Sequence, residues 1–248
     1  MKILALYSIK GGVGKTSSAV NLAFNAAQGG YRTLVWDLDP QGASSYYFRI
    51  KPKIKGGSKD LMAGKRELDE VIKGTDFDNL DLIPADFSFR NLDLLLDDKK
   101  KPTRQLKKRL APLANDYDFI FLDCPPSISL LSEAVFAAAD LLLSPIIPTT
   151  LSLRTLAQLK EFLDGHDLKN TRLMPFFSMV DRRKTMHKDI MRDALADYPE
   201  LLKTAIPYAS DIERMGLERM PLAAYSRKSR SAEAYHELWQ EILALTVP

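Results

Sequence analysis

The sequence predicts an α/β fold in which a mostly parallel β-sheet carries helices on both faces. Two observations predict it: short apolar runs alternate with longer amphipathic segments, and a glycine-rich turn joins the first run to the first such segment. This alternation is typical of βα units, whose crossover helices cover a parallel sheet. With 248 residues, 46% of them hydrophobic, the chain can bury one large core. We therefore expect a single domain over residues 1–248.

The first βα unit has the clearest pattern. Residues 3–7 predict a buried strand, residues 10–15 a glycine-rich turn, and residues 16–27 a helix that ends before Gly29 and Gly30. Further strands are expected at residues 33–37, 80–83, 119–122, 141–147 and 174–180, with a short one near Ala205. Helices are expected between these strands.

Two other segments have distinct patterns. Residues 50–59 are rich in Lys, Gly and Pro and have no clean period, so they predict a surface loop. Residues 232–245 predict a helix with one apolar face that packs on the sheet. The apolar positions of that helix are Tyr235, Leu238, Trp239, Ile242 and Leu245.

The bulk composition excludes several classes of protein. A single cysteine, Cys124, cannot form an internal disulfide, and the chain starts without a signal-peptide pattern, so we expect a cytoplasmic protein. No apolar run reaches the roughly 18 to 20 residues of a membrane-spanning helix. The net charge of +3 does not by itself indicate a polyanionic partner.

The segment Lys10–Thr16, Lys-Gly-Gly-Val-Gly-Lys-Thr, predicts a phosphate-binding loop because it lies between a strand and a helix. Glycines let backbone N–H groups approach a phosphate, and the helix N-terminus adds positive partial charge. Lys15 would contact the β- and γ-phosphates, and the Thr16 hydroxyl would bind Mg²⁺. The predicted ligand is a nucleoside triphosphate with magnesium.

Two aspartates at predicted strand ends are candidates for the metal site. Asp123 ends an apolar strand, the usual position of a carboxylate that holds Mg²⁺ directly or through water. The alternative is that Asp123 caps the next segment. Asp37, at the end of the second strand, would support Mg²⁺ or the adjoining loop.

The phosphate loop departs from the general pattern, which has glycine five residues before Gly14, because Ile9 stands there and is followed by Lys10. This variant resembles the deviant Walker A motif of the ParA/MinD family of partitioning and positioning ATPases. Three further segments resemble that family: the Asp-x-Asp-Pro-Gln-Gly switch at residues 36–42, the Walker B segment at 119–127, and the tail at 225–229 with 232–235.

The resemblance, closest to the ParA/Soj-like branch, implies a P-loop NTPase fold of the SIMIBI type. It also implies ATP and Mg²⁺ as cofactors and an ATP-dependent sandwich homodimer that binds DNA without sequence preference on the nucleoid. A ParB-like or other adaptor would stimulate an ATPase whose basal turnover is slow, and the cycle would position a cargo. Because the first strand begins at once, we expect the short form, which lacks an N-terminal DNA-binding domain.

The resemblance also assigns roles to residues. Lys10 would cross the dimer interface to the partner's nucleotide, although it could simply be a solvated loop lysine. Asp39 would face the γ-phosphate and orient or deprotonate the attacking water. With Lys15 these form the catalytic set. Pro207 and Ala209 would lie at the adenine, where many relatives have asparagine in place of Ala209. The predicted nucleotide-binding loop is Lys10, Gly11, Gly12, Val13, Gly14, Lys15, Thr16 and Ser17.

Basic residues cluster in the C-terminal third of the chain. Any one cluster is more often a solvated face, but together they are candidates for contact with DNA phosphates. The cluster from Lys99 to Arg109 could be only a solvent-facing helix start. The predicted DNA-binding residues are Arg182, Arg183, Lys184, Arg214, Arg219, Arg227, Lys228 and Arg230.

Three alternatives remain open. A MinD-like protein would bind membrane through a basic amphipathic tip, which residues 241–248 do not resemble because they contain no Lys or Arg. A metabolic ATP-dependent enzyme on the same fold would need a substrate pocket beside the γ-phosphate. A non-enzymatic nucleotide-binding adaptor would not need Lys15, Asp39 and Asp123 together. An iron–sulfur cluster is disfavoured, because a dimer would supply only two thiolates from Cys124.

Overall fold

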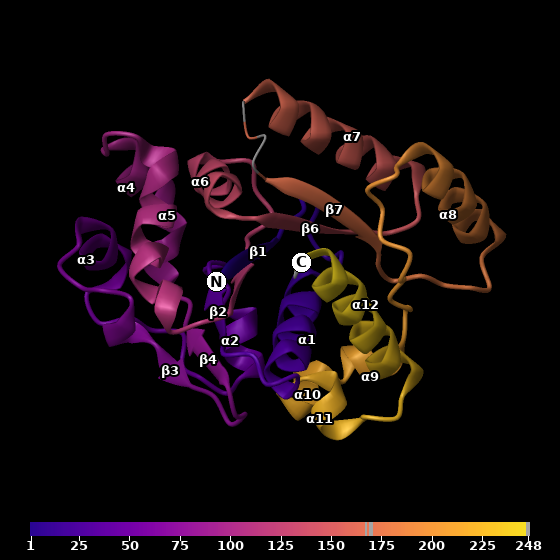
Figure 1. Ribbon diagram of the computed structural model, residues 1–248, viewed down its shortest axis with the longest axis horizontal. Helices are drawn as coiled ribbons and strands as arrows, with labels where there is room; N and C mark the ends of the chain where they lie inside the picture. Colours follow the sequence, from indigo (N-terminus) through magenta and orange to yellow (C-terminus); the bar gives the residue numbers. More distant parts are fainter. Residues whose placement is uncertain (167, 169–170, 247–248) are drawn as a thin grey trace.

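The computed structural model describes residues 1–166, 168 and 171–246. Its strands form one seven-stranded sheet in the order β3-β4-β2-β5-β1-β6-β7 (Figure 1). Neighbouring strands are parallel, except that the edge strand β3 is antiparallel to β4. The strands are β1 (Lys2–Leu6), β2 (Thr33–Asp37), β3 (Lys73–Gly74), β4 (Leu80–Ile83), β5 (Phe119–Asp123), β6 (Leu141–Ile146) and β7 (Arg172–Phe177). The predicted α/β class with a mostly parallel sheet is confirmed.

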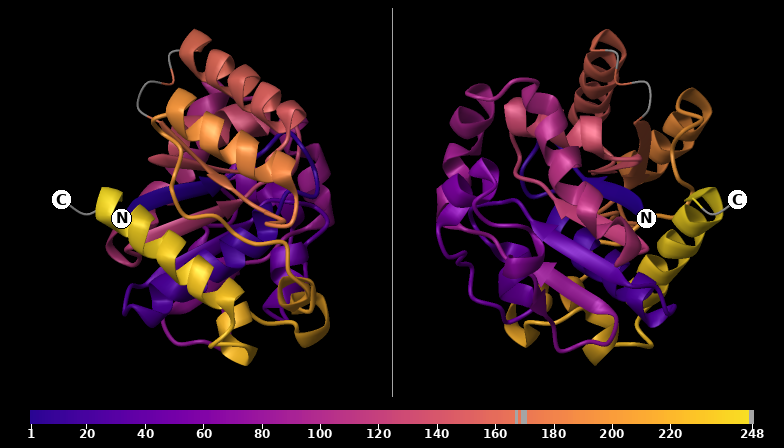
Figure 2. Two further views of the ribbon diagram at one scale, coloured as in Figure 1. Left: turned by 90° about the vertical axis from the view of Figure 1, so that its right-hand side faces the viewer. Right: turned by 60° about the vertical axis from the view of Figure 1, so that its left-hand side comes forward.

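Helices cover both faces of the sheet (Figures 1 and 2). In β1, Leu4 and Leu6 face a core formed with α1 (Lys15–Gln28) and α12 (Arg230–Thr246). Ile3, Ala5 and the next residue after the strand, Tyr7, face a second core formed with α4 (Leu92–Asp97), α5 (Gln105–Leu110) and α6 (Leu130–Ala138). Burial on both faces explains why this strand has a continuous apolar run instead of an alternating pattern. The longer helices are α1 (Lys15–Gln28), α6 (Leu130–Ala138), α7 (Thr150–Gly165), α8 (Thr185–Asp197) and α12 (Arg230–Thr246).

Short helices fill the connections. They are α2 (Ala43–Tyr47), α3 (Gly57–Ala63), α4 (Leu92–Asp97), α5 (Gln105–Leu110), α9 (Ser210–Glu213), α10 (Met215–Glu218) and α11 (Leu222–Tyr225). Single 3₁₀ turns cover Asp69–Val71, Phe87–Asn91, Pro102–Arg104 and Ala111–Asn115. In α5 the basic side chains accompany buried Leu106 and Leu110, so the Lys99–Arg109 cluster includes the solvent-facing side of an amphipathic helix.

The strand predictions are confirmed at 33–37 and 80–83 and are accurate to within one or a few residues for β1, β5, β6 and β7. The strand expected near Ala205 is wrong: only an isolated parallel bridge joins Pro207 to Val180. The sequence analysis also missed β3. Both residues of this strand, Lys73 and Gly74, are exposed, so no apolar pattern marks it.

Two segment predictions need correction. The loop predicted over 50–59 ends at Gly56, because α3 begins at Gly57 and buries Leu61 and Met62. The C-terminal helix does pack on the sheet, with the Trp239 ring 5.0 Å from that of Phe119, but Leu245 is exposed rather than part of the apolar face.

No helix of the described residues is both long enough and apolar enough to cross a bilayer. Val247 and Pro248, the last residues of the tip considered for membrane binding, lie outside the described part of the chain.

Candidate functional site

The glycine-rich loop connects β1 to α1 at the carboxyl edge of the sheet, where a phosphate site is expected in a parallel sheet. Gly12 (φ 69°) and Gly14 (φ 91°) have left-handed backbone conformations that side chains disfavour. A Cβ on Gly14 would also lie 2.8 Å from Ser178 Oγ, at the end of β7. Glycine at position 14 therefore satisfies both a backbone and a space requirement.

The two lysines of the loop lie in different environments. Lys15 is 7% exposed, and its Nζ donates a hydrogen bond to the carbonyl oxygen of Lys10 at 3.2 Å. Burial lowers the pKa of Lys15, whereas the charges of Asp123 and Asp39 raise it. Lys10 is exposed, and within the described residues no ion pair involves its side chain. Lys15 thus faces into the loop, while the charge of Lys10 is presented to solvent.

Asp37 and Asp123 are aligned in register at the ends of β2 and β5, and both are fully buried. Asp123 accepts hydrogen bonds from Thr16 Oγ1 at 3.3 Å and from Ser44 Oγ at 2.7 Å. Burial raises the pKa of both carboxyl groups, and the charge of Asp123 raises that of Asp37 further. A cation beside Asp123 would relieve this repulsion.

The donor set at Asp123 fits Mg²⁺. Magnesium is usually held by one or two carboxylates together with substrate phosphates and water, and Asp123 lies beside the Thr16 hydroxyl next to the phosphate loop. Asp37 has a different set of contacts: its Oδ2 accepts from the N–H and the hydroxyl of Ser45, at 2.8 and 2.7 Å. Its buried Oδ1 has no hydrogen-bond partner among the residues that the structure describes. Asp37 therefore holds the start of α2 directly.

The sequence analysis missed Ser44 and Ser45, the residues of α2 that contact these carboxylates. Both are fully buried, and Ser45 Oγ also accepts from the Ala85 N–H at 2.9 Å. Their only signal in the sequence was their place directly after the Asp-x-Asp-Pro-Gln-Gly segment, where a short helix begins.

Asp39 lies in a tight turn between β2 and α2. Its Oδ1 accepts from the Gln41 N–H at 2.9 Å, and its carbonyl oxygen accepts from the Gly42 N–H at 2.9 Å. Gly42 has φ 68°, and a Cβ there would lie 2.9 Å from Pro52. Asp39 is half-buried, and its charge reaches Lys15. The turn thus brings Asp39 close to the phosphate loop.

The structure places the predicted adenine residues in the segment between α8 and α9, which passes alongside the end of β7. Tyr208 N–H donates to the Val180 carbonyl oxygen at 3.0 Å, which fixes Pro207 beside the end of that strand. Pro207 lines a cavity of about 410 Å³ together with Arg182 and Arg230. Ala209 is the N-cap of α9 and makes no side-chain hydrogen bond to the helix.

The predicted DNA-binding residues do not form one uniform surface. Arg182 and Arg230, far apart in sequence, line the same cavity with Lys203, although Glu233 and Glu237 line it too. Arg183 pairs with Asp181 and Arg214 with Glu218, each at 2.9 Å. Three further members take part in no ion pair within the described part of the chain: Lys184, Arg227 and Lys228.

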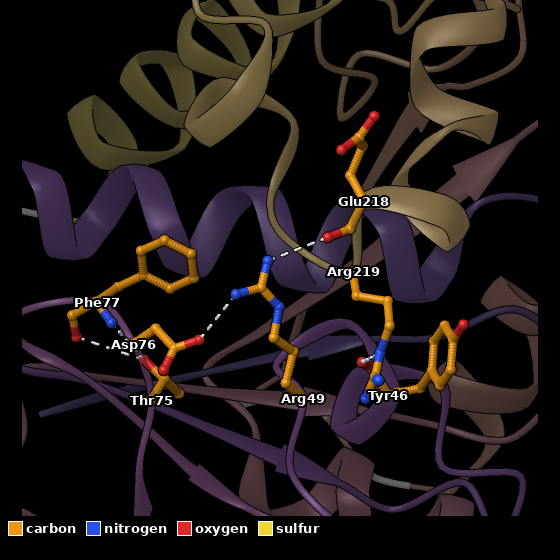
Figure 3. A network of polar contacts seen from close by, with 7 residues as sticks. All are labelled: Tyr46, Arg49, Thr75, Asp76, Phe77, Glu218 and Arg219. Carbon is orange, nitrogen blue, oxygen red and sulfur yellow. Dashed lines mark hydrogen bonds and ion pairs between the residues drawn. The ribbon is translucent and has the colours of Figure 1, made fainter.

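Arg219 is engaged within the protein. Its Cζ lies 4.4 Å from the centroid of the Tyr46 ring, and its Nε donates to the Tyr46 carbonyl oxygen at 3.2 Å (Figure 3). Of the predicted DNA-binding residues, Arg219 is therefore tied to α2, close to the nucleotide site.

Comparisons with known proteins identify the relatives of this chain. Residues 1–174 match a family model described as an AAA domain. The chain is 32% identical over 254 residues to the chromosome-partitioning ATPase Soj of Treponema pallidum, covering 98% of this chain and 97% of that protein.

Two solved structures extend the comparison. Cobyrinic acid a,c-diamide synthase from Mycobacterium smegmatis, with bound ADP and magnesium, superposes with a TM-score of 0.82 at 27% identity, covering 98% of this chain and 94% of that one. A putative plasmid partition protein from Borrelia burgdorferi, bound to AMPPNP, superposes with a TM-score of 0.84 at 23% identity, covering 98% and 99%. The second likeness shows a shared fold.

Proposed function

Because the chain belongs to the AAA domain family, whose model it matches, and to the family of the ParA/Soj partitioning ATPases, we propose that it is a ParA-type switch. It would bind ATP with Mg²⁺, close into a homodimer, hold DNA without sequence preference, and be released when a partner protein stimulates hydrolysis. A cargo associated with the nucleoid would be moved or spaced by this cycle.

Nucleotide binding is supported by the loop from Lys10 to Ser17. The left-handed glycines let its backbone approach phosphate oxygens, and the buried Lys15 would place its charge between the β- and γ-phosphates. Thr16 and Asp123 would hold Mg²⁺, with Asp37 supporting them through α2. When bound, the metal neutralises charge on the phosphates.

One observation carries the dimer proposal: the Lys15 side chain makes a hydrogen bond inside the loop, whereas the Lys10 side chain makes no hydrogen bond or ion pair with any residue that the structure describes. The exposed Lys10 would reach the nucleotide of a second subunit, as an arginine finger does, and stabilise the charge that develops during hydrolysis. The hydrolytic site of a monomer would then lack this lysine, so slow basal turnover is expected.

Asp39 would accept a hydrogen bond from the attacking water and orient it. The turn that holds Asp39 is constrained by Gly42 and Pro52, which restricts where its carboxylate can lie. We expect the Asp39→Ala variant to keep its nucleotide affinity and to lose most of its phosphate release. Loss of nucleotide binding would mean that Asp39 contacts the bound nucleotide and would contradict this role.

DNA binding is supported by Arg182 and Arg230, which converge on one cavity, and by Lys184, Arg227 and Lys228 near them in sequence. Contacts of this kind act on phosphates and carry no sequence preference. A ParB-like adaptor that completes the hydrolytic site would supply the switch-off step.

A second candidate function is a metabolic ATP-dependent enzyme. The likeness to cobyrinic acid a,c-diamide synthase at 27% identity favours it. Phosphate release measured with and without duplex DNA separates the two: a ParA-type switch responds to DNA with ATP present, and a metabolic enzyme ignores it.

The MinD-like alternative is tested by co-sedimentation with anionic liposomes, set beside a gel shift of arbitrary duplex DNA, each with ATP. We expect DNA binding without lipid binding. Lipid binding without DNA binding would overturn the proposed partner.

A further inference from the structure

The five-residue helix α2 directly follows the Asp39 turn of the candidate nucleotide site. At its start, Ser44 Oγ donates to Asp123 and Ser45 Oγ donates to Asp37, both at 2.7 Å and both buried. At its end, Tyr46 contacts α10. Within five residues, α2 therefore contacts both buried carboxylates and α10.

The contact between α2 and α10 is centred on Tyr46 (Figure 3). The Tyr46 hydroxyl donates to the Gly216 carbonyl oxygen at 3.1 Å. In the opposite direction, the Arg219 guanidinium lies over the Tyr46 ring, and its Nε donates to the Tyr46 carbonyl oxygen at 3.2 Å. Tyr46 therefore holds both ends of the turn from Gly216 to Arg219.

A second arginine ties the same turn to the sheet edge. Arg49 donates to the Glu218 carbonyl oxygen at 3.2 Å and to Asp76 Oδ2 at 3.3 Å, just after β3 (Figure 3). Arg49 (φ 60°) and Arg219 (φ 51°) both adopt the left-handed conformation, which is uncommon for residues other than glycine. Such backbone conformations persist where surrounding contacts hold them.

The other side of this turn rests on α1, the helix that begins at the phosphate loop. Asn21 is buried, its side-chain Nδ2 donates to Met215 Sδ at 3.2 Å, and its side-chain Oδ1 accepts from the Leu222 N–H at 2.8 Å. Met215 and Leu222, on either side of the turn, are thus fixed to α1, and Tyr46 of α2 contacts Gly216 and Arg219 between them.

We propose that Tyr46 is a positioning residue that couples the nucleotide site to the Arg219 turn, residues 216–219. The inference rests on the proposed function, since nucleotide and DNA are the two ligands that it links. Asp123 shares its two oxygens between Thr16 and Ser44, so a ligand contact that moves Thr16 or Asp123 also acts on the start of α2. α2 then carries this change through Tyr46 to Arg219, a DNA-contact candidate.

Linkage between two binding sites is reciprocal and is measured as a ratio of affinities. The first test uses fluorescence anisotropy of a labelled duplex DNA of arbitrary sequence, with and without AMPPNP and Mg²⁺. The ratio compares the DNA affinity with AMPPNP and Mg²⁺ to the DNA affinity without them. For coupled sites this ratio is typically about 5 to 150, and in Tyr46→Ala it should fall to within about twofold of one. AMPPNP affinity should change little, because Tyr46 is on the surface.

Two further variants sharpen this test. Tyr46→Phe keeps the ring beneath Arg219 but loses the hydroxyl donor to Gly216, so its affinity ratio should be intermediate. Tyr198→Ala, a half-buried tyrosine at the end of α8, is the matched control and should keep the full ratio. An unchanged ratio in Tyr46→Ala, or an equal loss in Tyr198→Ala, would overturn the inference.

A readout that needs no DNA separates this inference from the proposed function. Hydrogen exchange of residues 215–222 is followed as AMPPNP and Mg²⁺ are added. Protection should change in the unmodified chain and not in Tyr46→Ala. No change in the unmodified chain, or the same change in both, would contradict the coupling. If the unmodified chain fails to bind DNA, the proposed function fails, and hydrogen exchange still decides the role of Tyr46.

Discussion

Asp37 and Asp123 are register partners on adjacent strands, both fully buried, yet their side chains have different hydrogen-bond partners. The Asp123 carboxylate accepts hydrogen bonds from Thr16 and Ser44, whereas that of Asp37 accepts both of its hydrogen bonds within the described part of the chain from Ser45. The same strand-end position therefore supports two roles: a contact at the phosphate loop and an anchor for α2.

The first prediction concerns magnesium. Asp123→Asn keeps the size of the side chain but removes the charge beside Thr16, so Mg²⁺ should lose its main protein partner. We expect the Mg²⁺-dependent part of ATP affinity to fall about 10- to 100-fold, the range typical for loss of a group that supports a metal. Calorimetric titration with ATP, with and without Mg²⁺, measures it. Equal losses of ATP affinity with and without Mg²⁺ would mean that Asp123 stabilises the folded loop and does not hold the metal.

The second prediction concerns Gly14. Gly14→Ala adds a clash with Ser178 Oγ to the strain of a positive φ, whereas Gly30 has a similar φ of 87° and open space around its Cβ. Gly30→Ala is therefore the matched control for strain alone. We expect strain to cost about 1 kcal/mol or more in unfolding free energy and Gly14→Ala to cost clearly more than Gly30→Ala. Urea unfolding measures the loss of unfolding free energy in each variant. Equal losses would mean that the contact with Ser178 Oγ adds no cost at position 14.

The third prediction concerns the packing of the C-terminal helix. Trp239 is 1% exposed and packs edge-on against Phe119, so Trp239→Ala leaves a large cavity. The free energy of unfolding should fall by about 3 to 5 kcal/mol. Leu245→Ala on the same helix removes an exposed side chain and should change it by about 0.5 kcal/mol or less. Similar losses at both positions would mean that Leu245 is buried in solution.

The fourth prediction concerns DNA. Arg182 lines the cavity shared with Arg230, whereas its neighbour Arg183 is held by Asp181 at 2.9 Å. Arg182→Ala and Arg230→Ala should each weaken DNA binding and lower the slope of log affinity against log salt by about 1. Arg183→Ala should have the smaller effect. A larger effect of Arg183 would shift the contact surface away from this cavity.

Much of the fold could be predicted from the sequence because its inner strands are buried on both faces. Residues 33–37 and 80–83 are mostly apolar segments of strand length, interrupted only by Thr33, Asp37 and Asp81, and the structure has strands at these positions. The edge strand β3 could not be predicted in this way, since Lys73 and Gly74 bury nothing.

The candidate site was predictable where a local motif defines it, as at Lys15 and Thr16. Contacts between distant residues were not. Arg219 looked like one more basic surface residue, but its partner Tyr46 lies 173 positions away in the sequence. Ser44 likewise meets Asp123 across 79 positions. Pairings of this kind depend on tertiary packing, which no local pattern reports.

The central claim is that Lys10 completes the site of a second subunit, and sedimentation velocity tests it most directly. The unmodified chain should be a monomer with ADP and a dimer with AMPPNP and Mg²⁺. Lys10→Ala should bind AMPPNP normally and remain a monomer, whereas Lys15→Ala should lose nucleotide binding because it removes the buried charge. An AMPPNP-driven dimer of unchanged affinity in Lys10→Ala would contradict the account.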